Sequence, residues 1–409
     1  MSITPRERTL TALDHRQADR IPIDFWATED VFARLRAAWG LADDQAVLDR
    51  IGADLRYFNG PARKPPVSDD SPSRKRGVKN PRPFGSEPQG RRLPAGAINT
   101  ASREVGASDS PPDGILTDHW GVHRKCNTVT GTRRDGTSYT WTYKHLHASP
   151  LASAATVAEI DAYRWPDADA WDYSGVAAAC RAIRDAGYAV VVGADRLDRT
   201  AQLKPAMYLR GTEQFMADLI LEPAVAEAIL RHIAEYYLAY NERLLAAAGG
   251  GVDVFFMGDD MGTQSSTWVS PEMYRTFFKQ RFATYCGLAH RFGAKTMYHT
   301  CGRVTPLVGD FIDAGLDILQ SLQPQAMGDE LAWLKKEFGR DLCFQGGIDI
   351  QDVLPHGTPS DVAEHVRDRA AILGPGGGYI FGTAHNLLPD VPTENVIALV
   401  EAYQQYGAY

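Results

Sequence analysis

Three observations predict an α/β fold, a single (β/α)8 TIM barrel. First, short apolar runs alternate with long amphipathic stretches along most of the chain. Second, these runs are continuously apolar, which is typical of a parallel sheet covered by helices. Third, each of the last five runs ends in polar side chains, and a barrel gathers such side chains at the carboxyl ends of its strands. An open doubly wound sheet would instead concentrate them at one switch point.

The expected strands are eight apolar runs, and helix-like segments separate most of them. In chain order the runs cover residues 21–26, 53–58, 188–195, 252–260, 294–300, 316–323, 342–349 and 378–386. Ser270-Pro271-Glu272 is typical of a helix start, with a capping hydroxyl, proline at the first helical position and an acid in the first turn. Thr358-Pro359-Ser360-Asp361 has the same pattern. We therefore expect one barrel domain over residues 1–409.

Residues 61–113 depart from this alternation. They contain 10 of the 24 prolines, with 10 Lys/Arg against 6 Asp/Glu, and show no helical or strand period. We expect a long irregular insertion loop that is dispensable for folding, because it has little apolar surface to bury. Its role stays open between an arm that grips an acidic partner or phosphate and a solvated segment with no role.

Residues 117–149 are rich in Thr, Tyr and Trp and contain Gly-Thr and Asp-Gly turn pairs. They predict a β-hairpin excursion over one end of the barrel. Four histidines there are candidate ligands, although alternation along a surface hairpin explains their spacing equally well: His119, His123, His145 and His147.

Composition narrows the class of protein. The 409 residues carry a formal net charge of −8, which argues against nucleic acid as a partner. No apolar run approaches the ~20 residues of a membrane helix, and the N-terminus lacks the apolar segment of a secretory signal. Five scattered cysteines do not form a disulfide framework. We expect a cytoplasmic globular enzyme or binding protein with no membrane partner; the oligomeric state stays open, a homodimer included.

His299 and Cys301 are the strongest chemical signal. They lie two residues apart at a strand end, so both side chains point to the same side and could bind one ion. Imidazole with thiolate suits zinc, and catalytic zinc usually takes three protein ligands and leaves one position open. The third ligand would be His385 or Asp259, each at the end of another expected strand.

Other polar side chains at the strand ends are candidates for catalysis and substrate binding. Asp259 and Asp260 are the catalytic candidates, although adjacent carboxylates alternate in direction and a helix-capping role is the alternative. The candidates for substrate binding are Gln264, Gln320, Gln345, Asp349 and Asn386. Trp26, Trp120 and Trp268 suggest an aromatic-lined cavity, and core packing explains them as readily.

Several stretches together resemble the uroporphyrinogen decarboxylase superfamily, and more closely its methyltransferase-like branch, which acts with corrinoid proteins. They are HRQADRIPIDFW, TDHWGV, GDDMGTQSSTWVSPEMYRTFF, MYHTCGRV, FQGGIDIQDVLPHGTPSDV and GGYIFGTAHNLLPDVPTENV. The resemblance implies a barrel with its active site at the carboxyl-terminal mouth, and a zinc site in which His299 and Cys301 are two ligands. Relatives often supply a third ligand from a Pro-Gly-Cys-Gly stretch, which we match to Pro375-Gly376-Gly377-Gly378, where Gly377 cannot bind metal.

The expected function is therefore a zinc-dependent methyltransferase that moves a methyl group between a small methylated substrate and a thiol or a corrinoid on a separate partner protein. The alternative on the same barrel is a metal-free decarboxylase or lyase, with Asp259, Arg196 and Arg199 as candidate groups. The arginine-rich motif of the decarboxylase branch is absent from IPIDFWATED. A third hypothesis is that the protein is a binding subunit without catalytic activity.

Overall fold

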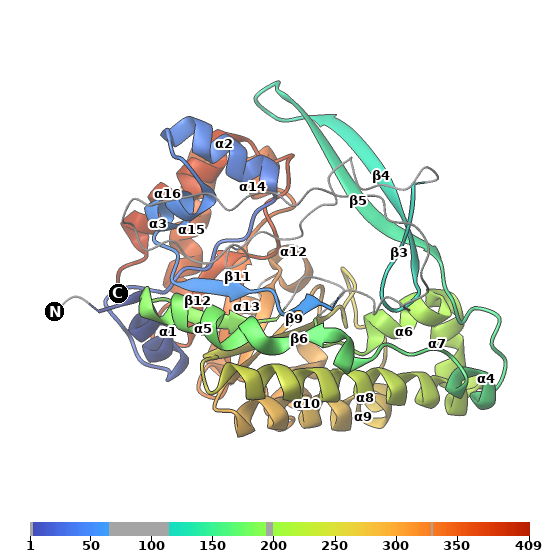
Figure 1. The fold of residues 1–409 in the computed structure, drawn as a ribbon. Helices are drawn as coiled ribbons and strands as arrows, with labels where there is room; N and C mark the ends of the chain where they lie inside the picture. The colour runs from blue at the N-terminus through green and yellow to red at the C-terminus, as the bar shows by residue number, and fades with distance from the viewer. Residues whose placement is uncertain (1–2, 65–113, 194–198, 329) are drawn as a thin grey trace, which may run out of the picture.

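The computed structural model describes residues 3–64, 114–193, 199–328 and 330–409. Its centre is a seven-stranded, fully parallel sheet that curls into a barrel-like arrangement with helices outside it (Figure 1). The strands follow the sheet order β1 (Leu55–Phe58), β7 (Ala189–Val192), β8 (Val254–Asp259), β9 (Lys295–Thr300), β10 (Ile318–Leu322), β11 (Cys343–Ile348) and β12 (Tyr379–Thr383). Each coincides with one of the expected apolar runs.

The first expected strand, residues 21–26, is not a ladder strand. It forms isolated parallel bridges between Ile23 and Phe381 and between Ala27 and Leu387, while the Asp54 amide donates to the Ile23 carbonyl at 2.9 Å. The segment therefore lies between β12 and β1, where an eighth strand would close the barrel. The expectation of eight ladder strands is wrong at this position. Pro22 explains the difference, because a residue without an amide proton cannot continue a ladder.

The helices pack around the sheet, and the longest, α8, runs along one side of the molecule (Figure 1). Their starts follow the expected sequence signals: the Ser270 hydroxyl accepts from the Met273 amide at 3.1 Å, and Thr358 forms a capping box with Asp361. None of the described helices is long and apolar enough to cross a bilayer. The bounds are α1 (Pro5–Leu13), α2 (Glu29–Trp39), α3 (Asp44–Ile51), α4 (Val157–Asp161), α5 (Val176–Asp185), α6 (Leu203–Arg210), α7 (Thr212–Leu221), α8 (Pro223–Ala248), α9 (Pro271–Phe277), α10 (Lys279–Arg291), α11 (Val308–Asp313), α12 (Pro324–Met327), α13 (Glu330–Phe338), α14 (Val353–His356), α15 (Pro359–Leu373) and α16 (Thr393–Tyr406).

Alternate strand residues, together with Leu13 of α1, form a small apolar cluster inside the curled sheet, separate from the larger core between sheet and helices. Because strand side chains alternate, the residues two positions further along β9, β10 and β11 also point inward. Those residues are polar. The apolar cluster contains Leu13, Leu55, Tyr57, Ala189, Val191, Val254, Phe256, Met297, Ile318, Cys343 and Ile380.

An antiparallel hairpin of β4 (His123–Thr132) and β5 (Ser138–Ala148) extends from the body of the protein, with β3 (Ile115–Thr117) at its base (Figure 1). At the base, the Arg124 guanidinium lies 4.4 Å from the ring centre of Tyr208 in α6. At the tip, Arg133 donates to the Pro389 carbonyl at 2.6 Å and to Asp30 of α2 at 3.2 Å. The hairpin is therefore fixed at both ends, on segments that follow β7 and β12.

The insertion lies almost wholly outside the described residues. Only its first residues are described: Ala62–Arg63 form the short strand β2, which pairs antiparallel with β6 (Trp171–Asp172). The expectation that the insertion is dispensable for folding stays a prediction.

Arg133→Ala should release the hairpin tip, because the Arg133 side chain is buried and donates four hydrogen bonds there. The acceptors are Pro389, Thr137, Ser138 and Asp30. We expect amide hydrogen exchange in β4 and β5 to accelerate by about tenfold or more, as for a loss of about 1.4 kcal/mol. The matched control is Arg134→Ala, which removes an exposed ion pair with Glu394 and should change exchange little. Equal exchange in the two variants would show that Arg133 does not anchor the tip.

Candidate functional site

His299 is the centre of the polar layer that lies above the apolar cluster. It is the penultimate residue of β9 and is 2% exposed, and its Nδ1 hydrogen-bonds the side-chain Oε1 of Gln320 on the neighbouring strand β10. Because an amide carbonyl only accepts, Nδ1 carries the proton and the Nε2 lone pair faces the Cys301 Sγ, 3.2 Å away. Burial lowers the pKa of His299 well below its usual value, and the charges of Arg199 and His385 lower it further. The ring is therefore a neutral imidazole with its metal-binding nitrogen free of a proton.

Cys301 and His385 complete a group of three donors. Nitrogen atoms of His299 and His385 and the Cys301 Sγ all lie within 4.8 Å of one another, and the two imidazole rings are 5.7 Å apart. Among the described residues, this is the group of three or more His, Cys, Asp or Glu whose geometry suits a metal ion. Two neutral imidazoles and one thiolate form a donor set that zinc accepts, so the residues present fit the ion.

The turn after Cys301 is fixed by its neighbours. The Gly302 amide donates to the Gln323 Oε1 at 2.6 Å, and Gly302 has a φ of +86°. A Cβ at this position would collide with the backbone of Gly262 and Thr263, so glycine is required for both reasons. Gln323 thus helps to set the direction of the Cys301 side chain.

The structure corrects the assignment of Gly377 to the position of a third ligand. Residues 375–378 precede β12, whereas His385 follows it, so the two lie at opposite ends of the strand, roughly 25 Å apart at the usual rise per residue. A Cβ at Gly377 would meet the backbone of Arg16, and its carbonyl accepts from Lys335. His385, the donor after the strand, therefore lies where a third ligand is needed.

Asp259 and Asp260 have different surroundings although they are adjacent. Both carboxylate oxygens of Asp259 accept from backbone amides at the start of α6, those of Gln202, Leu203 and Lys204, at 2.6–2.8 Å. This is the helix-capping alternative, and it leaves the carboxylate fully engaged. Burial nevertheless raises the pKa of Asp259, with the three amides opposing that shift.

Asp260 faces the three-donor group instead. Its Oδ1 accepts from the Cys301 amide at 3.3 Å and lies 3.6 Å from the Nε2 of His299, while its Oδ2 forms an ion pair with Lys204. Asp260 is therefore the carboxylate that can act on a group held beside His299 and Cys301. Lys204 at the start of α6 orients it, a role that the sequence did not indicate.

A buried carboxyl that the sequence reasoning missed lies in the same layer. Asp24 accepts from the Tyr57 hydroxyl at 2.6 Å and from the Gln345 Nε2 at 3.4 Å. Desolvation raises the pKa of Asp24 to about 7, against the lowering effect of the Tyr57 hydrogen bond. The polar residue inside the apolar run 21–26 was the available signal, because strand alternation turns Asp24 inward.

The other expected substrate-binding residues divide into two groups. Gln320 and Gln345 are register partners on β10 and β11 and are almost completely buried, while Asn386 is buried next to His385 in the chain. Gln264 lies exposed and hydrogen-bonds Gln351 at 3.3 Å. Asp349 accepts from the amides of its own loop, at Gln351 and Asp352. The structure therefore brings Gln320 and Gln345 to the candidate metal centre and places Gln264 and Asp349 in the loops around it.

Of the three tryptophans, Trp26 belongs to this site. Its ring stacks nearly parallel to His299, with centroids 6.5 Å apart, and meets Tyr57 and Phe256 edge-on. Trp120 packs in a separate aromatic cluster against Tyr236, and Trp268 is partly exposed. His119 belongs to that separate cluster too, where burial lowers its pKa to about 4.

Of the two arginines proposed for decarboxylation, Arg199 lies among the described residues. Arg196 lies outside the described residues. Arg199 is buried, with its guanidinium 5.0 Å from the ring centre of Phe256, and Gly258 leaves room for it because a Cβ there would lie 3.0 Å away.

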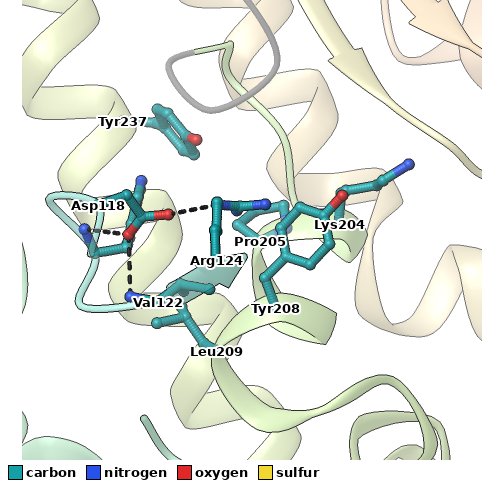
Figure 2. Close-up of a pocket in the computed structure, with 9 residues that line it drawn as sticks. Asp118, Val122, Arg124, Lys204, Pro205, Tyr208, Leu209 and Tyr237 are labelled. Carbon is teal, nitrogen blue, oxygen red and sulfur yellow. Dashed lines mark hydrogen bonds and ion pairs between the residues drawn. The ribbon is translucent and has the colours of Figure 1, made fainter. Parts of the chain in front are cut away.

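A small cavity adjoins the base of the hairpin. Figure 2 shows Arg124 between Asp118 and Tyr208, with the Lys204 side chain extending away from Asp118. The cavity has a volume of about 10 Å³, which is close to the minimum for a single water molecule. It is a packing space beneath the hairpin, and a substrate does not fit in it.

Comparison with known proteins gives the family. The sequence profile of the family "Uroporphyrinogen decarboxylase (URO-D)" matches residues 146–406, more than half of the chain. The chain belongs to the URO-D family. The match includes β7 to β12 and all three donors of the candidate metal centre.

Two branches of the URO-D family appear among the relatives. A methylated-thiol–coenzyme M methyltransferase of Methanosarcina mazei is 27% identical over 50% of this chain and 52% of its own. A methylcobamide:CoM methyltransferase, MtaA, of Methanosarcina barkeri is 27% identical over 49% and 55%. A uroporphyrinogen decarboxylase of Coxiella burnetii is 26% identical over 47% and 50%. The chain thus spans about half the length of the curated relatives it matches, and its resemblance to the methyltransferase-like branch is confirmed.

A solved structure supports the fold over the whole chain. A methyltransferase from Methanosarcina mazei superposes with a TM-score of 0.59 and covers 100% of both chains at 20% sequence identity. At that identity the likeness concerns the fold, which is TIM-barrel-like.

Asp259→Ala and Asp260→Ala should differ in stability despite their adjacency. Asp259→Ala leaves three buried amides without their acceptor, so we expect the free energy of unfolding to fall by about 2–4 kcal/mol. Asp260→Ala removes a partly exposed ion pair and should cost about 1 kcal/mol or less. Urea unfolding measures both, and similar losses in the two variants would contradict the capping role of Asp259.

Asp24 should make stability depend on pH. Its pKa is raised from near 4 to about 7 by folding, so the folded chain binds the proton more tightly. This contribution is fully present below pH 4 and is lost as pH rises through 7. Asp24→Asn should therefore reduce the loss of unfolding free energy between pH 4 and pH 8 by up to about 4 kcal/mol in urea titrations. Exposed Asp341→Asn is the control, and an Asp24→Asn variant with the wild-type decline would rule out this assignment.

Proposed function

We propose that this protein is a zinc-dependent methyltransferase that moves a methyl group between a small methylated substrate and a thiol or a corrinoid carried by a partner protein. The observation that supports it most is the convergence of His299, Cys301 and His385 at the carboxyl ends of β9 and β12. Three protein donors with a fourth position open are typical of catalytic zinc. The methyltransferase relatives support the reaction type.

The three donors would hold zinc in a pocket prepared by their neighbours. Gln320 fixes the His299 tautomer, and Gln323 with Gly302 directs Cys301. A zinc ion at this place would act as a Lewis acid, lowering the pKa of a bound thiol or polarising the heteroatom that carries the methyl group.

The remaining steps belong to residues of this chain. Asp260 lies where it can accept the proton that a thiol or alcohol loses when it becomes the nucleophile, and Lys204 keeps the carboxylate oriented. Trp26 and Phe256 form an apolar wall beside His299 that excludes water from the reacting group.

The metal-free decarboxylase remains the second candidate, because a decarboxylase relative also matches. Such a reaction needs cations for several substrate carboxylates. Of the described candidates, Lys204 is paired with Asp260 and Arg199 is buried against Phe256, so the geometry favours methyl transfer.

Zinc content tests the proposal directly. We expect near-stoichiometric zinc in wild-type protein purified without chelator, and at least about tenfold weaker affinity in His299→Ala, Cys301→Ala and His385→Ala. His290→Ala and Cys126→Ala are matched controls, since both residues lie outside the three-donor group, and should retain zinc. Metal analysis and competition with a chelating dye provide the measurement.

An activity assay separates the two candidates. The zinc-loaded protein should transfer the methyl group of free methylcobalamin to coenzyme M, with loss of the methylcobalamin absorbance. Full zinc occupancy in the His299→Ala/Cys301→Ala double variant, or decarboxylation of uroporphyrinogen by metal-free protein, would overturn the proposal.

A further inference from the structure

Two separate hydrogen-bond networks occupy the polar layer beneath the mouth of the barrel. In the first, His299 Nδ1 donates to the Oε1 of Gln320. In the second, the Tyr57 hydroxyl and the Gln345 Nε2 both donate to Asp24. In these contacts the Gln320 oxygen faces His299 and the Gln345 nitrogen faces Asp24.

The two networks end at glutamines on neighbouring strands. Gln320 and Gln345 are register partners on adjacent parallel strands, and they are 1% and 2% exposed. Within the described residues, the Gln320 Nε2 and the Gln345 Oε1 have no hydrogen-bond partner although both atoms are buried. One donor and one acceptor are thus left on neighbouring strands, and an unsatisfied buried polar atom costs about 1–3 kcal/mol.

The chemistry of this pair selects its ligand. A hydroxyl group accepts one hydrogen bond and donates another, so it would satisfy Gln320 and Gln345 together and join the networks from Asp24 to His299. A carboxylate would accept from Gln320 but would oppose the Gln345 oxygen. A methyl ether would also leave the Gln345 oxygen unsatisfied.

The aromatic side chains beside His299 favour a ligand that carries an aromatic ring. Trp26 stacks along His299, the ring that Gln320 binds, and meets Tyr57 and Phe256 edge-on at 5.4 and 5.2 Å. Neighbouring strands are about 4.8 Å apart, so a hydroxyl between Gln320 and Gln345 would lie one to two strand spacings from His299. A ring carrying that hydroxyl would have both a wall to pack on and the candidate metal centre beside it.

We propose that Gln320 and Gln345 form a subsite for a hydroxyl group of the substrate, with a phenol as the preferred class. The inference deepens the proposed function and rests on it only for the reaction that the bound molecule undergoes. The subsite itself consists of residues of this chain and exists without the metal.

Binding of small probes to the metal-free full-length protein tests the subsite. The probes are phenol, methoxybenzene and benzoate, and the measurement is isothermal titration or ligand-observed saturation-transfer NMR. We expect phenol to bind at least about tenfold more tightly than methoxybenzene or benzoate, since only phenol satisfies both amides.

Variants assign the selectivity to the glutamines. Gln345→Leu should bring phenol to within about twofold of methoxybenzene, and it leaves the hydrogen bond between Gln320 and His299 in place. Gln320→Leu should have the same effect on selectivity. Gln404→Leu, at an exposed position of α16, is the control and should keep the wild-type selectivity.

The outcomes distinguish this inference from the proposed function. Equal binding of phenol and methoxybenzene to the wild-type protein would overturn the hydroxyl subsite even if neither variant folded. Unchanged selectivity in correctly folded Gln345→Leu and Gln320→Leu would also overturn it. Zinc content of the same variants purified without chelator reports on the proposed function alone, because probe binding is measured on separate metal-free samples.

Discussion

The hydrogen bond between His299 and the side-chain carbonyl of Gln320 is the interaction on which the site depends. It decides which ring nitrogen carries the proton and therefore which one can bind a metal. Burial acts in the same direction, because it keeps the imidazole neutral where a charged ring would repel a cation. A parallel sheet makes this contact easy to build: the two residues are register partners, so no loop has to be ordered to bring them together.

The same strand geometry explains why adjacent residues have different tasks. Successive side chains turn to opposite sides, and one of the two neighbouring aspartates fastens α6 while the next faces the three donors. Fastening α6 also fixes Lys204, which orients the second aspartate. Asp259, which caps α6, and Asp260, which faces the three donors, are therefore linked through Lys204 in the first turn of α6.

Much of the fold could be predicted because it follows from local chemistry. Seven of the eight apolar runs are strands, and the capping signals at Ser270 and Thr358 begin helices where expected. His299 and Cys301 could also be predicted, since two donors at strand spacing can be recognised in the sequence itself. The exception was the segment 21–26, where hydrophobicity indicated a strand but Pro22 cannot donate to a ladder.

The rest of the site could not be read from the sequence because it depends on three-dimensional register. The sequence left the third ligand open between His385 and Asp259, and a glycine-rich match aligned Gly377, which precedes β12, with a ligand position of relatives, since sequence similarity alone does not show where a strand begins and ends. Asp24 was hidden because a single polar residue in an apolar run gives no sign of its partners, which come from β1 and β11. Lys204 lies far from Asp260 in sequence and carries no motif.

The attachment of the hairpin tip has a consequence for the order in which the protein folds. Arg133 binds the carbonyl of Pro389, four residues after His385, so a segment from the first third of the chain steadies the loop that bears the last donor. During synthesis, His299 and Cys301 leave the ribosome well before His385 does, and the hairpin must wait for the same final segment to be anchored. The complete group of three donors and the fixed hairpin therefore both require the segment that follows β12, so a nascent chain that ends before this segment has neither.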